Sequence, residues 1–120
     1  MKRDLDLLRD MLLKIEESGS EINPLSIEDF LELNADPEII SYHLYLLEDA
    51  NFINVAFTNQ FYDTTNYFVA TLTMRGCDYL DAVRDSSIWN KAKEKLKTVG
   101  GSAAMDVVKT IAVKIAISQI

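Results

Sequence analysis

Apolar residues recur at helical spacing near the start of the chain. Four of them lie three or four residues apart and therefore share one face of a predicted helix: Leu5, Leu8, Leu12 and Ile15. The run Ser18-Gly19-Ser20 is expected to end this helix, because glycine suits the left-handed position that follows a helix.

Two further helices are predicted before residue 52. The first is short, spans 27–33 and has Ser26 as its cap. The second has Asp36 as its cap and Pro37 at the first helical position, where the fixed φ of proline fits a helix. The inner face of this second helix carries Ile40, Leu44 and Leu47. Asn51 is then expected to take the left-handed turn that usually falls to glycine.

The pattern changes in the middle of the chain from helical spacing to strand-forming residues. Residues 52–57 and 67–72 are rich in strand formers and are joined by a polar segment, which indicates a β-hairpin. Thr73 is expected to cap a helix that runs to about residue 84. Two more helices are predicted over 87–98 and 103–118, on either side of a pair of glycines.

These elements predict an α+β fold that is mainly α. Their order is that of a winged helix-turn-helix with a β-hairpin wing, to which additional C-terminal helices are attached. A chain of 120 residues has the size of one domain. We assign 1–85 to the winged-helix core and 86–120 to a C-terminal helical extension packed on the same domain.

Several stretches resemble known bacterial sequences. The segment ISYHLYLLEDANFI resembles the recognition helix and first wing strand of bacterial winged-helix regulators, and LTMRG resembles the Leu-Thr-x-x-Gly that follows their wing. Nearly the whole chain resembles an uncharacterised family of bacterial and prophage winged-helix proteins of unknown function, through MKRDLDLLRDMLLKIEE, RDSSIWNKAKEKL and the GGS before the last helix. The resemblance implies the fold and a phage-linked setting, and it implies no activity.

Charge is unevenly distributed along the chain, whose formal net charge is −7. Residues 15–74 contain eleven acidic residues and no lysine or arginine, whereas 1–14 carry a net +1 and 75–120 a net +3. A helix-turn-helix presents the outward residues of its recognition helix to DNA bases. Here those residues are Glu38, Ser41, Tyr42, His43 and Tyr45. Because lysine and arginine supply most of the affinity for phosphates, this surface disfavours DNA, and a DNA-binding transcriptional regulator is the alternative interpretation.

Aromatic residues are concentrated around the same predicted surface. Tyr42, Tyr45 and Tyr67 are expected near the wing. The candidate wing residues are Asn59, Gln60, Phe61 and Tyr62. Aromatic side chains are enriched at interface hot spots, so an acidic, aromatic patch favours a basic protein partner. The alternative is that several of these rings only cover the core.

The last predicted helix is apolar around most of its circumference. Such breadth requires cover on more than one side. It is explained either by packing against the first helix and the wing sheet or by a homodimer seam, for which the candidates are Val108, Ile111 and Ile115. No apolar run approaches the roughly 20 residues that cross a bilayer, so no membrane contact is expected.

Residue types for catalysis are sparse. With one histidine and one cysteine, the chain lacks a metal-ligand cluster of the usual spacing, and it lacks a glycine-rich phosphate loop. His43 and Cys77 are the conceivable base and nucleophile, but a buried, hydrogen-bonded histidine is the favoured interpretation. Trp89 is likewise interpreted as a core residue. We expect no catalytic residues, no metal and no cofactor.

Two features favour a cytoplasmic location. The opening residues pass directly into an amphipathic pattern without a secretory signal, and the lone Cys77 cannot form an internal disulfide. The function expected from the sequence is that of a non-enzymatic, phage- or prophage-linked winged-helix interaction protein, which binds a protein partner or itself.

Overall fold

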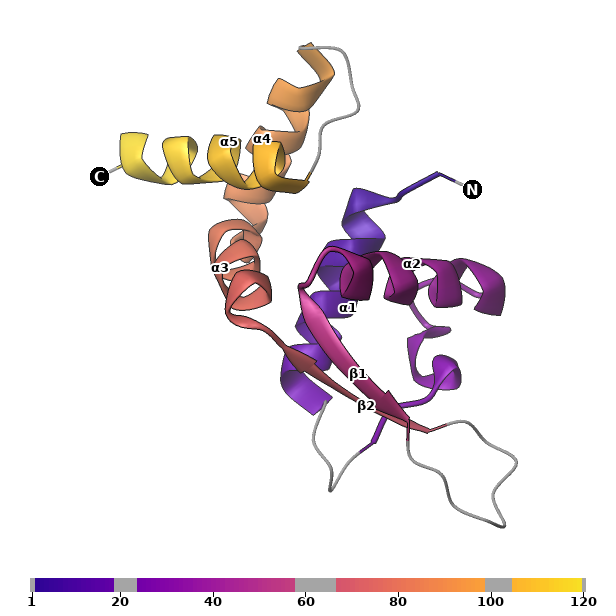
Figure 1. Cartoon of the computed structure of the whole chain (residues 1–120). Coiled ribbons are helices and arrows are strands. Elements are labelled where there is room, and N and C mark those ends of the chain that lie inside the picture. The colour runs from indigo at the N-terminus through magenta and orange to yellow at the C-terminus, as the bar shows by residue number, and fades with distance from the viewer. Residues whose placement is uncertain (1, 19–23, 58–66, 99–104, 120) are drawn as a thin grey trace. The chain divides into compact units, whose positions relative to one another are not determined.

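The computed structural model describes residues 2–18, 24–57, 67–98 and 105–119 (Figure 1). Within these ranges the protein is α+β and mainly helical, as predicted, with five α-helices, one 3-10 helix and a two-stranded antiparallel sheet. The chain divides into two compact units, Met1–Cys77 and Asp78–Ile120. The packing of 86–120 on the predicted core 1–85 stays a prediction.

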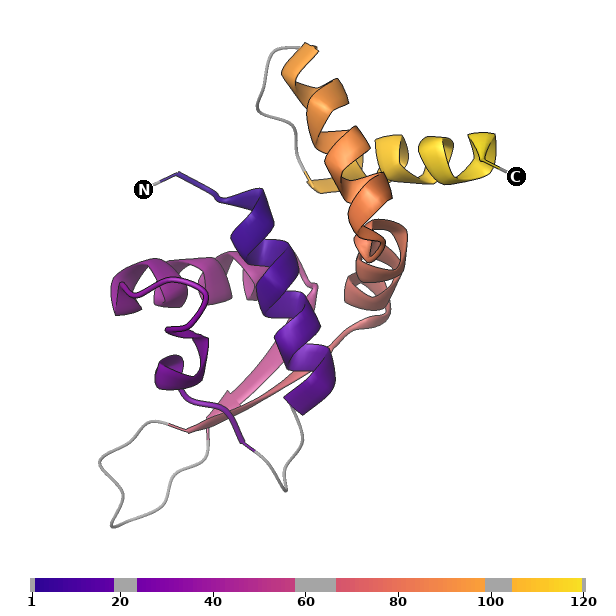
Figure 2. The same ribbon diagram turned by 180° about the vertical axis from the view of Figure 1, so that it is seen from behind.

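The first unit combines helices with a hairpin. Its elements are α1 (Leu5–Ser18), η1 (Ile27–Phe30), α2 (Pro37–Asp49), β1 (Ile53–Phe57) and β2 (Phe68–Leu72). In the hairpin, Ile53 pairs with Leu72 and Phe57 with Phe68. Leu25 bridges to Phe68 through two backbone hydrogen bonds of 2.8 Å. Figure 2 shows α1 crossing the hairpin; α1 contacts β2, and α2 contacts β1 and η1.

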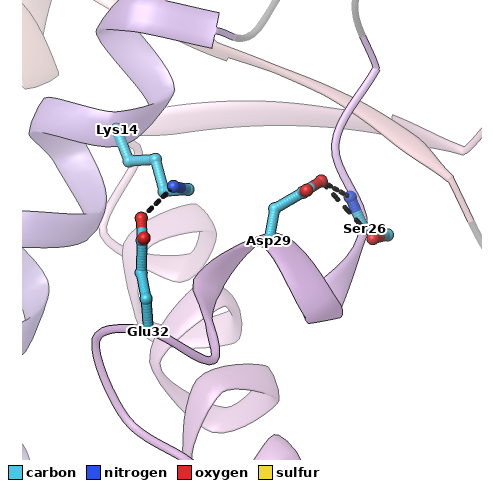
Figure 3. A network of polar contacts seen from close by, with 4 residues as sticks. All are labelled: Lys14, Ser26, Asp29 and Glu32. Atoms are coloured by element: carbon cyan, nitrogen blue, oxygen red, sulfur yellow. Dashed lines mark hydrogen bonds and ion pairs between the residues drawn. The ribbon is translucent and has the colours of Figure 1, made fainter.

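The short helix predicted over 27–33 begins at Ile27 after Ser26 as predicted, but it is the 3-10 helix η1, which ends at Phe30 and is followed by turns. Figure 3 shows how it begins: the Asp29 carboxylate accepts a hydrogen bond of 2.8 Å from the Ser26 backbone N–H. At the other end, the Asn34 side chain accepts from the Asp36 backbone N–H at 2.9 Å. The first bond belongs to a capping box, which starts the helix, and the second is an Asx turn that leads the chain into the cap of α2.

Helix α2 begins and ends as predicted. The Asp36 carboxylate accepts a hydrogen bond of 2.9 Å from the Glu38 N–H, and Pro37 occupies the first turn. At the C-terminal end, Asn51 has a φ of 62°. The Asn51 N–H donates to the Glu48 carbonyl and the next N–H, of Phe52, donates to the Leu47 carbonyl, each at 2.9 Å. These paired bonds define a Schellman motif, which reverses the chain from α2 into β1.

Substitution of Asn51 tests this turn. Asn51→Val should destabilise the protein by about 1–2 kcal/mol, because a β-branched residue is strained in the left-handed region. Asn51→Gly should be neutral or slightly stabilising, since glycine adopts that region freely. Urea denaturation followed by circular dichroism measures both variants. Equal stability of the two would contradict the role of Asn51 in the turn.

The junction between β2 and α3 (Met74–Val83) is closely packed against the same turn. Thr73 caps α3 as predicted, because its hydroxyl oxygen accepts a hydrogen bond of 3.1 Å from the Gly76 N–H. A Cβ atom at Gly76 would lie 2.0 Å from the backbone oxygen of Phe52. Only glycine therefore allows the first turn of α3 to approach the turn between α2 and β1.

The second unit contains the end of α3 together with α4 (Ser86–Thr98) and α5 (Met105–Ser118). The Asp85 side chain caps α4 by accepting from the Ile88 N–H at 3.0 Å. Helices α4 and α5 pack on each other and cross in both views (Figures 1 and 2). Their buried residues include Trp89, Ala92, Leu96, Met105, Val108 and Ala112. In the described part of the chain, every helix is too short or too polar to span a bilayer.

Candidate functional site

A hollow of about 380 Å³ opens on the surface of the first unit. It is bounded by η1, α2 and the hairpin, and α2 lies beside the hairpin in both views (Figures 1 and 2). Its lining residues are Ile27, Ser41, Leu44, Tyr45, Glu48, Val55, Phe57 and Phe68. The three elements follow one another along the chain, and their lining residues lie between Ile27 and Phe68.

Aromatic rings form the floor and part of the rim of this hollow. Phe68 is buried and stacks on Phe30 of η1, with ring centroids 6.3 Å apart. Phe57 meets Phe68 edge to face at 6.2 Å but is itself 70% exposed. On the opposite rim, Tyr45 of α2 is 61% exposed. Large aromatic groups left this open to water are typical of surfaces that bind a partner.

The charge at the hollow is negative. Glu48 is exposed and is the single charged residue among the lining residues that the structure describes. Lys14, the nearest preceding cation in the sequence, forms an ion pair with Glu32, as Figure 3 shows. Arg75 lies over the ring of Phe52, 5.3 Å from its centroid. Phe52 precedes the first residue of β1, whereas Phe57 is the last residue of that strand. The hollow therefore combines apolar walls with one carboxylate.

The residues predicted for the recognition-helix surface lie in different places in the structure. Ser41 and Tyr45 line the hollow. Glu38 is exposed in the first turn of α2. Tyr42 is half-buried, and its ring meets the ring of His43 edge to face with centroids 5.6 Å apart. The structure thus brings two of these side chains together and leaves Glu38 outside the hollow.

His43 lies inside the protein and is only 1% exposed. Its Nδ1 is 2.7 Å from the Ile39 carbonyl oxygen, and its Nε2 accepts a hydrogen bond of 2.9 Å from the Asp4 backbone N–H. A carbonyl oxygen can only accept, so Nδ1 carries the proton and the imidazole is neutral. Asp4 in turn caps α1 by accepting from the Leu7 N–H at 3.1 Å. His43 therefore ties α2 to the start of α1 and is not a surface residue.

The remaining predicted residues lie elsewhere. Asn59, Gln60, Phe61 and Tyr62, the predicted wing residues, fall outside the described part of the chain. Of the predicted seam residues, Val108 is buried within the second unit, and Ile111 and Ile115 are half-buried. Cys77 is half-buried with a free thiol. No cluster of three or more metal-ligating side chains occurs among the residues that the structure describes.

Sequence reasoning missed Glu48, Leu44, Val55 and Phe57 as members of the site. A signal for Phe57 was present, because Ile53, Val55 and Phe57 alternate along a predicted strand and must share one face. Ile53 is buried and Phe57 is exposed, so this face runs from the core to the surface. The sequence did not indicate that α2 would lie next to Phe57, at the exposed end of that face.

The fold and the hollow define an α+β protein with a surface hollow between a helix and a hairpin, lined by apolar residues and by Glu48. The chain belongs to the family described as "Hypothetical protein (DUF2513)", whose model matches residues 2–103. It is also 32% identical over 112 residues to a protein of Haemophilus influenzae strain Rd named "Uncharacterized protein", a match that spans 93% of this chain and 92% of the relative. No solved structure matches the chain. The family of unknown function predicted from the sequence is confirmed.

Proposed function

We propose that this protein is a non-enzymatic, phage- or prophage-linked interaction protein of winged helix-turn-helix architecture. The order α1, η1, α2, hairpin, α3 supports the architecture, with α2 in the position of the recognition helix. The hollow beside α2 supports binding of an apolar protein segment that carries lysine or arginine. The observation that carries this proposal is the lining itself, in which exposed aromatic rings surround apolar walls and Glu48 supplies the charge.

The hydrogen bonds of His43 support the non-enzymatic part of the proposal. Both ring nitrogens are engaged, one with the Ile39 carbonyl and one with the Asp4 N–H. A general base must have a free nitrogen within hydrogen-bond reach of the proton it removes. His43 would have to give up its hydrogen bond with the Asp4 N–H before Nε2 could activate the thiol of Cys77.

The competing function, a DNA-binding transcriptional regulator, is favoured by Ser41 and Tyr45, whose hydroxyl groups can bond to base edges. It is opposed by the absence of lysine and arginine from 15–74, because these residues supply most of the affinity for phosphates. Fluorescence anisotropy with a labelled mixed-sequence duplex at low and at physiological salt separates the two functions. We expect no submicromolar, salt-sensitive binding, and finding it would favour the regulator.

Selection of peptides from a random display library on the immobilised full-length chain tests the hollow directly. Selected peptides should pair lysine or arginine with large apolar residues. Their affinity should fall about tenfold or more for the double variant Tyr45→Ala/Phe57→Ala, since truncation of aromatic hot spots costs at least that much.

Met74→Ala is the matched control for this selection. Met74 is 79% exposed and does not line the hollow, so its truncation removes a comparable apolar side chain at another place. Selected peptides that bind the double variant as tightly as the wild-type chain would show that the hollow is not the binding site.

A further inference from the structure

Strand β2 has a backbone neighbour on each side. Its partner along one side is β1. On the other side, the N–H and the carbonyl oxygen of Phe68 each form a hydrogen bond of 2.8 Å with Leu25. Among the strands that the structure describes, β1 pairs with β2 alone, so β1 is an edge of the sheet.

The hairpin register fixes which backbone groups lie on the outer side of β1. In an antiparallel pair, residues that exchange hydrogen bonds with the partner strand alternate with residues that do not. Phe68 directs its backbone groups away from β1, so its partner Phe57 is of the second kind. The N–H and carbonyl groups of Val55 and Phe57 therefore point outward, whereas those of Ala56 point toward β2. Neither Val55 nor Phe57 makes a backbone hydrogen bond outside the hairpin to any described residue.

Strand β1 lacks the usual protection of an exposed edge. Natural sheets block such edges with lysine and other charged residues, or with proline, which discourage a further strand. The strand Ile53–Phe57 reads INVAF and contains neither a charged residue nor a proline. Ala56 and Phe57 are exposed, and Val55 is half-buried. The end of β1 that contains these three residues is therefore open to another strand.

The open edge and the hollow share two residues, because Val55 and Phe57 also line the hollow. Directly opposed residues on paired strands point to the same face of a sheet. Residues of an added strand opposite Val55 and Phe57 would therefore point to the face on which the hollow lies. A cavity of about 150 Å³ accommodates a benzene-sized group, so a hollow of about 380 Å³ has room for a large apolar side chain.

The edge and the hollow together define one binding mode. We infer that an extended segment of a protein partner adds to the outer side of β1 as an antiparallel strand, with apolar side chains in the hollow and a lysine or arginine near Glu48. Backbone hydrogen bonds to Val55 and Phe57 supply affinity, and the alternate side chains in the hollow supply specificity. This inference rests on the proposed function of the hollow and names the conformation of the segment that it binds.

Charge favours a foreign segment over a second copy of this chain. Pairing of two β1 edges about a two-fold axis would bring the acidic surfaces of both copies together, including Glu48 of each. Residues 15–74, which contain the edge and the hollow, have eleven acidic residues and no lysine or arginine to offset them. Like charges that face each other across an interface oppose association, whereas a segment with lysine or arginine brings the opposite charge.

A scan of N-methylated peptides tests the inference on the full-length chain. The probes are the peptides selected by display, with each residue N-methylated in turn and the affinity measured by fluorescence anisotropy. Affinity should fall about tenfold or more at every second residue, because there the methyl group removes a hydrogen bond and prevents close approach. The intervening residues, whose N–H groups point away from β1, should change affinity by less than about threefold. A loss without this alternation would overturn the inference.

Amide hydrogen exchange followed by NMR locates the contact on the protein. Without peptide, the Val55 amide should exchange at least about tenfold faster than the Ala56 amide, which is bonded to β2. A saturating selected peptide should slow exchange at Val55 by about tenfold or more, with a much smaller change at Ala56. Unchanged exchange at Val55 in the complex would overturn the inference.

Val55→Pro removes the outward N–H but keeps the hydrogen bonds within the hairpin, because proline is tolerated where the N–H of an edge strand points away from the sheet. Peptide affinity should fall about tenfold or more. Val55→Ala is the matched control, since it keeps the N–H, truncates the side chain further and should lose less affinity. Equal losses in both variants would contradict a backbone contact. The peptide scan uses the wild-type chain, so it decides the inference even if Val55→Pro does not fold.

These outcomes separate the inference from the proposed function. If selected peptides depend on Tyr45 and Phe57 but show no alternation in the scan, the hollow binds them in another conformation and only the strand addition is wrong. If no selected peptide depends on these two residues, both proposals are wrong. Slow exchange at Val55 without peptide would also overturn the inference, because the edge would already be covered, by a second copy if sedimentation velocity shows a dimer.

Discussion

Replacement of Gly76 by alanine is expected to destabilise the first unit by about 2–3 kcal/mol, the cost of forcing backbone to shift in a packed region. The added Cβ would lie 2.0 Å from the backbone oxygen of Phe52 and 3.0 Å from its carbonyl carbon. Two hydrogen bonds hold the backbone of Phe52. Its N–H donates to the Leu47 carbonyl oxygen at 2.9 Å, and its own carbonyl oxygen accepts from the Thr73 N–H at 3.0 Å. It cannot move away without disrupting the Schellman motif or the start of α3.

The sign of the Gly76→Ala effect is diagnostic. In an exposed helix the same change stabilises by up to about 1 kcal/mol, because alanine is the better helix former. Urea denaturation followed by far-ultraviolet circular dichroism measures the change, and the fluorescence of Trp89 reports on the second unit separately. Asp78→Ala, at an exposed position of α3, is the control and should stay within about 0.5 kcal/mol of the wild type. A Gly76→Ala variant that is more stable than the wild type would contradict the close approach.

The elements that the sequence predicted correctly are those with local chemical signals at their ends. Asp36 and Pro37 mark the start of α2, Asn51 marks its end, and Thr73 marks the start of α3. Each signal acts within a few residues of the chain, so it can be read without knowledge of the fold. Over 27–33 the cap Ser26 marked the start of the helix correctly, but the sequence did not indicate that a 3-10 helix would form and end at Phe30.

The hollow could be predicted only in part, because it depends on tertiary packing. Ser41 and Tyr45 were identified from their place on α2, but the residues opposite them come from η1 and from the two strands. The hairpin register pairs Phe57 with Phe68 and so places both residues at the end of the hairpin that lines the hollow. No spacing in the sequence encodes that relation, so Phe57 was assigned to a strand and not to a site.

The placement of His43 could have been read from the helical pattern. Ile40 lies three residues before it and Leu47 four residues after it, so His43 falls on the stripe that is buried. The sequence analysis named His43 among the outward candidates but favoured a buried, hydrogen-bonded histidine, and this second interpretation is confirmed. The structure shows that a polar residue on an apolar stripe is accommodated when both of its nitrogens find backbone partners.

The acidic segment 15–74 and the hollow together define the chemistry of the surface beside α2. The surface of α2 beside the hairpin presents apolar contact area and hydroxyl groups, and residues 15–74 contain no lysine or arginine that could bind phosphate. Apolar area with one carboxylate is suited to a protein segment in which an aliphatic residue and a lysine are neighbours.

His43→Ala is expected to destabilise the protein by about 3 kcal/mol, which combines the loss of a buried ring with an unsatisfied polar group. The Asp4 N–H would lose its acceptor and the Ile39 carbonyl its donor. His43→Asn should lose less, because its amide can still donate near the position of Nδ1 but cannot reach Asp4. Urea denaturation of both variants measures the order of stability, wild type above Asn above Ala.

A second measurement distinguishes this structural role from a role in recognition. Long-range nitrogen–proton NMR correlations should show the neutral ring with the proton on Nδ1, as its partners require. Peptides selected on the hollow should bind the folded fraction of His43→Asn with unchanged affinity, because His43 does not line the hollow. A loss of binding without a loss of stability, or an Ala variant within about 0.5 kcal/mol of the wild type, would return His43 to the binding surface, where the sequence first placed it.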